Sequence, residues 1–324
     1  MTEPWFGTSS RARAGKPFTG RDRAGAAHRG TKDGTKGGAS ANSRSRFPAA
    51  ANPGFLGTGM SDHLACIGIS TAEPQAFEQT LNRLAARAPV RARPDGGKLL
   101  AWRDTSGAAL VLQLGRKGEV LCFTPTFDGA SRIAAVPRRL INDSRCQFCE
   151  RMLVDVRDDQ GRVAYPLIVS VEDAGAVRDR IPLDEDVTLS VTAFAEVIAA
   201  WPDEAAFRQD AGPGEPGVEA FLPAGLYAQE EAPAAEAIFT GRVVASETRT
   251  NASTGKRFVW AEVKTEGGTY DVVAAAESLP AGLLPGAIVQ GVFWMVGRVV
   301  QGLKNLPAPS KKKGAGANGH VSGA

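Results

Sequence analysis

A chain of 324 residues, 43% of them hydrophobic, is long enough for about two domains and apolar enough to bury a sizeable core. The formal charge of +3 is unevenly spread: residues 60–235 carry 18 basic and 26 acidic side chains, whereas residues 1–59 carry ten basic and three acidic ones. An acidic body disfavours nucleic acid as a partner, and the absence of an apolar run of ~20 residues argues against a membrane span.

The first 59 residues are rich in Gly, Ala, Ser, Thr and basic side chains and hold few large apolar groups. Such a composition does not bury enough surface to offset the entropy of ordering the chain. We therefore expect residues 1–59 to be either a disordered tail or a mis-annotated N-terminal extension, with the native start at Met60, where the composition changes abruptly.

Residues 60–210 predict an α+β domain with a mixed sheet and one main helix. The apolar run Leu64–Ile69 is expected to be its first strand, and Thr71 and Pro74 suit the start of the main helix, whose Phe77, Leu81 and Leu84 form one apolar stripe. Alternating or continuous apolar runs predict the remaining strands, at 98–103, 108–114, 119–123, 151–156 and 163–171. Residues 187–199 fit either one long strand or a strand that turns into a helix, and residues 202–207 a short helix.

Residues 211–235 are rich in Pro, Gly, Ala and Glu and predict a linker. Beyond the linker, residues 236–303 contain four strand-like runs and a strong hairpin signal at Glu266–Thr269. Gly291 and Gly297 interrupt the last run, as glycines do where a sheet curls into a barrel. We expect a small β-barrel here, followed by a disordered basic tail over residues 304–324.

The strand pattern and glycine placement of residues 236–303 resemble an OB-fold, a small barrel that commonly binds oligonucleotides or oligosaccharides on one face. In the run from Phe258 to Thr265, the Val/Ala/Val row suits a core, which would turn the alternate row outward. The candidate ligand-binding residues are therefore two turn cations and three aromatic residues: Lys256, Arg257, Phe258, Trp260 and Tyr270. The alternative is that Phe258 and Trp260 pack against the barrel or against the first domain.

The start of the first domain resembles half of a vicinal-oxygen-chelate (glyoxalase-like) protein in the order of its elements. His63 begins a predicted strand, the helix that contains Phe77 follows, and two strands come next, the first of which contains Trp102. That resemblance implies a metal ligand at His63. The other two histidines, His28 and His320, lie in the predicted tails, so a site with two histidines is not expected, and His63 also suits a capping or edge position. The two parts in this order also resemble an uncharacterised actinobacterial two-module protein family, which implies no activity.

Two further groups of residues bear on chemistry. Cys146 and Cys149 form a CxxC motif, whose two thiols can share a zinc ion or form a redox pair. The other two thiols, Cys66 and Cys122, lie within apolar runs. We interpret all four cysteines as incidental. The acidic clusters Asp158/Asp159 and 184–186 fall in predicted turns, where Asp is favoured for local backbone bonding.

The favoured hypothesis is a non-enzymatic binding or scaffolding protein of the cytoplasm, with the C-terminal barrel as its partner surface and neither cofactor nor metal. One alternative is a glyoxalase-like small-molecule binder or enzyme that uses a cavity in the first domain. The other is an OB-type binder of single-stranded nucleic acid.

Overall fold

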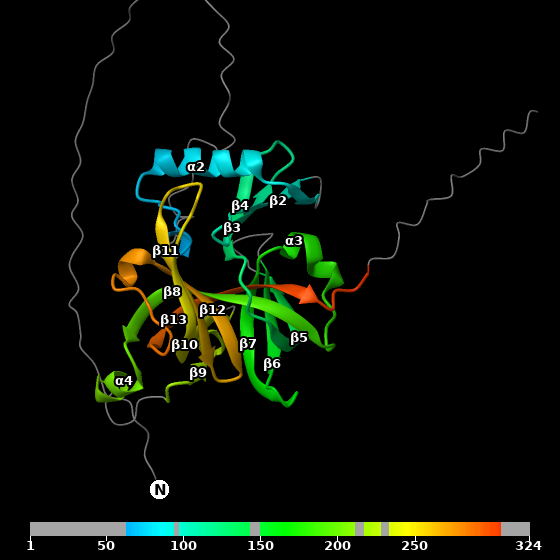
Figure 1. The fold of residues 1–324 in the computed structure, drawn as a ribbon. Helices are drawn as coiled ribbons and strands as arrows, with labels where there is room; N and C mark the ends of the chain where they lie inside the picture. The colour runs from blue at the N-terminus through cyan, green and yellow to red at the C-terminus, as the bar shows by residue number, and fades with distance from the viewer. Residues whose placement is uncertain (1–62, 94–96, 143–149, 211–216, 228–232, 306–324) are drawn as a thin grey trace, which may run out of the picture. The chain divides into compact units, whose positions relative to one another are not determined.

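A computed structural model describes residues 63–93, 97–142, 150–210, 217–227 and 233–305 (Figure 1). Within these ranges the chain is α+β and mostly sheet, with both antiparallel and parallel pairings. The N-terminal extension expected over residues 1–59 and all but the start of the expected basic tail lie outside the described residues. In the part of the chain that the structure describes, every helix is too short or too polar to cross a membrane.

A four-stranded antiparallel sheet and helix α2 form the first part of the fold. Helix α2 (Pro74–Arg87) buries the predicted stripe of Phe77, Leu81 and Leu84, and Pro74 begins it as expected, although its N-cap is Glu73 rather than Thr71. The sheet has the order β1-β2-β3-β4, with bounds Val90–Ala92, Lys98–Arg103, Ala108–Leu114 and Val120–Phe127. Strands β2 and β3 agree with the prediction, and β4 extends four residues beyond it.

The segment Leu64–Ile69 is not the expected first strand. It forms a helical turn in which the amide N–H of Ile67 donates to the carbonyl of Leu64 at 3.1 Å, and Gly68 follows with a φ of 72°. Leu64, Cys66, Ile67 and Ile69 are all buried, so the run lacks the alternation of a half-buried strand. A short continuous apolar run fits a buried turn as well as a strand, and the β-α-β-β order of a glyoxalase-like half is therefore not formed.

The second part of the fold is a nine-stranded mixed sheet. Its first strands are β5 (Ile133–Asn142), which the sequence did not predict, and the hairpin of β6 (Glu150–Arg157) and β7 (Val163–Val171), which it did. Strand β8 (Val187–Trp201) is one long strand that does not turn into a helix. The later strands are β9 (Phe221–Leu222), β10 (Glu236–Thr250), β11 (Arg257–Thr265), β12 (Gly268–Ala275) and β13 (Ile288–Gln301).

Short helical segments connect these strands. Helix α3 (Ala174–Val177) and the 3-10 turn η2 (Arg178–Arg180) link β7 to β8, and helix α4 (Glu204–Asp210) follows β8 close to the predicted short helix. The predicted linker contains β9 and the turn η3 (Ala224–Leu226), while residues 211–216 and 228–232 of it lie outside the described part. The turn η4 (Ala276–Ser278) lies between β12 and β13.

Strands β8 and β13 pair along almost their whole lengths and close two rings of strands. The first half of β8 pairs with β5 and the last part of β13 with β7, which closes the first ring: β5, β6, β7, β13 and β8. The middle of β8, residues 192–194, pairs with β12 and the first part of β13 with β10, which closes the second ring: β10, β11, β12, β8 and β13. Each ring contains one parallel pairing, β7 with β13 or β12 with β8.

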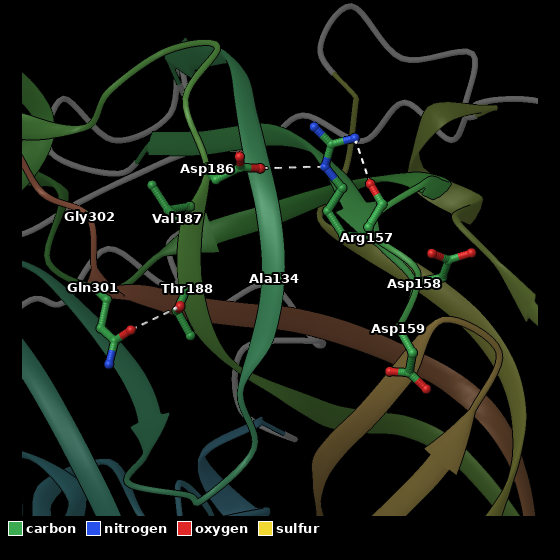
Figure 2. Close-up of a pocket in the computed structure, with 10 residues that line it drawn as sticks. Ala134, Arg157, Asp158, Asp159, Asp186, Val187, Thr188, Gln301 and Gly302 are labelled. Atoms are coloured by element: carbon green, nitrogen blue, oxygen red, sulfur yellow. Dashed lines mark hydrogen bonds and ion pairs between the residues drawn. The ribbon is translucent and has the colours of Figure 1, made fainter.

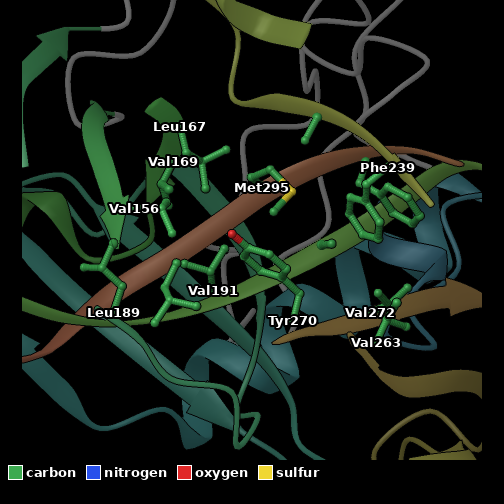
Figure 3. Close-up of a cluster of buried hydrophobic side chains, with 14 of the residues drawn as sticks. Val156, Leu167, Val169, Leu189, Val191, Phe239, Val263, Tyr270, Val272 and Met295 are labelled. Carbon is green, nitrogen blue, oxygen red and sulfur yellow. The ribbon is translucent and has the colours of Figure 1, made fainter. Parts of the chain in front are cut away.

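One hydrophobic core fills both rings (Figure 3). It includes Val156 and Leu167 from the first ring, Val263 and Val272 from the second, and Met295 from the β13 strand that the two share. The sequence predicted a barrel made by residues 236–303 without help from the first domain. A barrel of those residues alone is not confirmed, because they supply four strands of the second ring and β8 supplies the fifth.

Candidate functional site

The predicted aromatic platform on β11 and β12 is not an open surface. The Val/Ala/Val row of β11 does face the core of the second ring, as expected, but the alternate row is only partly open: Phe258 is buried, Trp260 and Glu262 are half-buried, and Lys264 is exposed. Phe258 is 0% exposed and packs in a second core together with the apolar side of α2 and of the four-stranded sheet. The alternative interpretation, that Phe258 and Trp260 pack against the first domain, is the one the structure supports.

The other predicted binding residues are scattered. Tyr270 is 0% exposed inside the second ring, where its hydroxyl lies 2.5 Å from the hydroxyl of Tyr165. Trp260 is half-buried, its indole N–H donates to Asp271, and the Arg249 guanidinium lies 4.2 Å from its ring centroid. Lys256 and Arg257 are exposed at the start of β11. The five residues therefore do not share one ligand surface.

His63 is buried and lies against the ring of Trp294, with 4.5 Å between centroids and 16° between planes. Its Nε2 lies 3.1 Å from Oε1 of Glu196, and this hydrogen bond is the main cause of a lowered pKa at Glu196. Among the described residues, His, Cys, Asp and Glu side chains form no cluster of three or more that suits a metal ion. The position of His63 is thus explained by packing and by one hydrogen bond.

The predicted acidic clusters come together around an open hollow of about 640 Å³ (Figure 2). Its charged lining is Arg157, Asp158, Asp159 and Asp186. Asp186 pairs with Arg157 at 3.5 Å, and Asp158 accepts hydrogen bonds from the backbone and side chain of Arg162, which lower its pKa. These contacts close the turns between strands, as predicted for Asp in such positions, and do not define a ligand site.

The two cysteines that the structure describes lie apart. Cys66 is buried in the second core, and Cys122 is buried on the outer side of β4. Cys146 and Cys149, the predicted CxxC, lie outside the described residues.

A second cavity lies between the outer face of the four-stranded sheet and α3, and we call it the α3 cleft. Its larger chamber, of about 300 Å³, has a sheet wall, a helix wall and several charged groups. The residues that line this chamber are Arg91, Ala92, Leu99, Ala101, Arg103, Val111, Glu172, Asp173, Ala176, Val177 and Arg180. A small adjoining chamber of about 10 Å³ shares Leu99, Val111 and Glu172 and adds Gln113 and Cys122. Its volume suits about one water molecule.

Strand alternation explains the sheet wall of the cleft. On β2 and β3 the residues that face α2 are large and apolar, whereas Leu99, Ala101, Val111 and Gln113 point to the other side. The antiparallel register places Leu99 opposite Gln113 and Ala101 opposite Val111, which makes a continuous surface with one polar group. The helix wall is short and made of small side chains, from Ala174 to Val177, and Ala176 packs directly against Leu99, Ala101 and Val111.

A network of charges forms the floor of the cleft. Glu172, whose side chain is 3% exposed, lies 3.2 Å from Nη1 of Arg298 and 3.8 Å from Nη2 of Arg103, and it accepts a hydrogen bond from Thr126. Both arginines also pair with Asp128. Two cations thus face two carboxylates, and a buried pair needs such partners to offset its desolvation.

Asp173 and Gln113 stand outside this network. Burial and the neighbouring Glu172 carboxylate raise the pKa of Asp173 to about 6. Its buried Oδ1 and the buried Oε1 of Gln113 have no hydrogen-bond partner among the residues that the structure describes, and Gln113 is only 4% exposed. An unpaired buried polar group costs roughly 1–3 kcal/mol, so a ligand or water that binds these atoms would recover that energy.

Two cations stand at the mouth of the cleft. Arg91 is exposed on β1 and Arg180 is half-buried at the end of η2, and neither has an ion-pair partner within the described ranges. The Nε of Arg180 donates to the carbonyl of Lys304 at 3.0 Å, which holds the side chain in place. A guanidinium without a carboxylate partner is a ready contact for an anion.

Sequence reasoning missed the α3 cleft because its residues come from three separate segments, 91–113, 122–124 and 172–180. The one available signal was Gln113, a lone amide within the apolar run of β3. No protein-family model matches this chain, and no curated protein matches its sequence.

Proposed function

We propose that this protein is a non-enzymatic binding protein and that it takes a small anionic ligand in the α3 cleft. The observation that carries the proposal is the combination, in the larger chamber, of two arginines without acidic partners among the described residues and the buried Oδ1 of Asp173 without a donor. The volume of about 300 Å³ lies at the lower end of the ~300–1,000 Å³ range of small-molecule sites.

The proposal keeps the binding role expected from the sequence and moves the site. The expected partner surface on the C-terminal strands is covered by the four-stranded sheet and α2, where Phe258 and Val273 join the second core. The cleft also belongs to the segment in which a cavity for a small-molecule binder was expected.

The test is a ligand screen by thermal shift and titration calorimetry with small anions, on the full chain and on two variants. The double variant Arg91→Gln/Arg180→Gln removes both charges from the mouth. Arg257→Gln is the matched control, since it removes an exposed arginine of the surface that the sequence predicted. We expect an anion that binds the wild type and the control equally and the double variant at least about tenfold more weakly. Equal binding by all three proteins rules out the α3 cleft as the site.

A second candidate function follows from the rings. We propose that each ring is an OB-like barrel, which is supported by its five strands and by its three consecutive antiparallel strands. OB-folds bind single-stranded nucleic acid through their second and third strands. In the second ring these are β11 and β12, whose outer face is covered around Phe258 and Val273, so β6 and β7 of the first ring are the relevant pair.

This second candidate is tested by the fluorescence anisotropy of a labelled oligonucleotide at low salt. The variant Arg138→Gln removes an exposed cation of β5, next to β6, and Arg257→Gln is again the control. Weaker binding by Arg138→Gln alone supports the first ring, whereas no binding by the wild type at low salt eliminates the candidate.

A further inference from the structure

Strand β8 has an open edge along its last five residues, 197–201, which we call the β8 edge. The start of β8 pairs with β5 and its middle with β12, whereas residues 197–201 pair only with β13 among the strands that the structure describes. The carbonyl of Val197 points toward β13, since a Cβ added at Gly291 would collide with its oxygen. This direction alternates along an antiparallel strand, so Ile198 and Ala200 direct their N–H and C=O groups outward. Within the described ranges, no backbone group meets them there.

Solvent reaches the β8 edge from both faces of the strand. Val197 is 65% exposed, and Ala199 and Ala200 are exposed as well. Because side chains alternate along a strand, Val197 and Ala199 lie on one face and Ala200 lies on the other. Helix α4 follows β8 in the chain but extends away from this edge, since its Glu204 pairs with Arg242 of β10, on the far side of β13. The edge is therefore accessible to another strand.

The β8 edge lacks the features that keep sheet edges from pairing with other chains. Natural edges are blocked by proline, by charged side chains, by bulges or by being very short. Strands β1 and β9 are only three and two residues long. The longer open edges of the described sheets contain proline or charged residues, namely Pro125 in β4, Pro137 in β5, Pro166 in β7, and Glu247 and Arg249 at the end of β10. Residues 197–201 are Val, Ile, Ala, Ala and Trp, so the β8 edge has neither.

We propose that the β8 edge is a dimer interface, at which two copies of this chain pair their β8 strands antiparallel about a two-fold axis. Such an axis matches each residue with a mirrored position of the same segment. Because residues 197–201 carry no charge, no like charges face each other across the axis. With Ala199 on the axis, the outward groups of Ile198 meet those of Ala200 of the partner subunit. Val197 then faces Trp201 of the partner subunit, and a β-branched residue opposite an aromatic one is a stabilising cross-strand pair.

A second copy suits this edge better than a charged peptide does. On the outer face, Val197 begins an apolar row that continues in register through Val292, Ile238 and Leu222 of the neighbouring strands. An added strand places its own side chains beside this row, and the β8 edge of a second copy supplies apolar ones. The pairing uses five strand residues per subunit, against the ~20–30 of a stable interface, so we expect a weak dimer with a micromolar dissociation constant. The β8 edge shares no residue with the α3 cleft, so this inference does not depend on the proposed function.

The experiment is sedimentation velocity of the full chain from ~1 to ~100 μM, a range in which a micromolar dimer forms. The variant Val197→Lys/Ala199→Lys places like charges across the axis and is expected to raise the dissociation constant at least about tenfold. Val163→Lys/Ala164→Lys is the matched control, because it adds the same charge at two exposed positions of β7. We expect the control to dimerise as the wild type does.

A complementary variant tests whether the edge pairs with its own copy. Val197→Glu/Ala199→Glu should also be monomeric by itself, because two carboxylates then meet at the axis. An equal mixture of the lysine and glutamate variants should form a dimer again, since opposite charges now face each other. Circular dichroism and melting temperatures show that both variants fold, which is expected because both side chains are exposed.

Three results would overturn the proposal. A wild type that stays monomeric at ~100 μM removes the dimer, and hydrogen exchange of the Ile198 and Ala200 amides then shows whether another segment of the same chain covers the edge, as slow exchange, or whether it is open, as fast exchange. A dimer that the lysine and glutamate variants leave intact forms through another surface. Lysine and glutamate variants that are monomeric and do not associate when mixed exclude the pairing of two β8 edges.

Discussion

The indole Nε1 of Trp260 donates a 2.7 Å hydrogen bond to Oδ1 of Asp271, a carboxylate with no exposed surface. The other oxygen of Asp271 accepts the backbone N–H of Ser131 at 2.8 Å. One buried carboxylate thus joins β11, β12 and the segment that leads into β5. Trp260, expected to offer its ring to a ligand, is instead linked through Asp271 to the segment that leads into the first ring.

We predict that Asp271→Asn destabilises the protein by about 1–3 kcal/mol. The amide keeps one acceptor, but its NH2 group then meets a donor, either the indole of Trp260 or the backbone of Ser131, and a buried donor loses its partner. The free energy of unfolding is measured by urea denaturation. Asp159→Asn is the control, because Asp159 is exposed in a turn. Equal stability of the two variants would show that the buried bonds contribute nothing measurable.

The paired hydroxyls of Tyr165 and Tyr270 give a second prediction, by a double-mutant cycle. Burial raises the pKa of both tyrosines, so both stay neutral, and each hydroxyl has the other as its partner at 2.5 Å. Either single change to Phe leaves one buried hydroxyl unpaired and is expected to cost about 1–3 kcal/mol. The double change to Phe removes both groups, so we expect it to cost less than the sum of the two single changes. Additive costs in urea denaturation contradict the pairing.

Much of the local structure was predictable because the periodicity of single segments encodes it. The α2 stripe, β2, β3 and the β6–β7 hairpin all depend on neighbours in the sequence. The ring closures depend on which distant strand supplies the fifth member. Strand β8 reads as one apolar run, and nothing within Val187–Trp201 indicates that its start and its middle close different rings.

The candidate site was less predictable for the same reason. The row of Val259, Ala261 and Val263 correctly indicated the core side of β11, but the sequence does not show that a second sheet covers Phe258 on the other side. The acceptors of the α3 cleft are recognisable only after the fold leaves them without donors. Asp173 has no unusual sequence context, and its chemistry arises from burial and from Glu172.

Asp173 also predicts a pH dependence of stability. The ordinary pKa of Asp, ~3.9, applies to the unfolded chain, and the native pKa is about 6. Between these values the native state holds a proton that the unfolded chain has released, so the free energy of unfolding falls as pH rises from about 4 to about 6. Asp173→Asn does not titrate and should lack this component. Urea midpoints at pH 4, 5, 6 and 7 measure it, as a wild type that loses stability relative to the variant across this window. A constant difference between the two proteins would contradict a raised pKa.

The shared β8–β13 ladder predicts that both rings unfold together, unlike two independent modules. Gly297 lies in this ladder, and a Cβ there would approach the carbonyl oxygen of Ser190 to 2.7 Å, so Gly297→Ala requires the strands to shift and is expected to cost about 1–3 kcal/mol. Gly217→Ala is the control, because nothing lies within 4 Å of the added carbon. Hydrogen exchange in moderate urea measures the opening free energies of amides in β6 and β11, one strand from each ring. Because each ring needs β13 for closure, Gly297→Ala should lower both values by the same amount. A loss confined to one strand would mean that the rings unfold as separate units despite their common core.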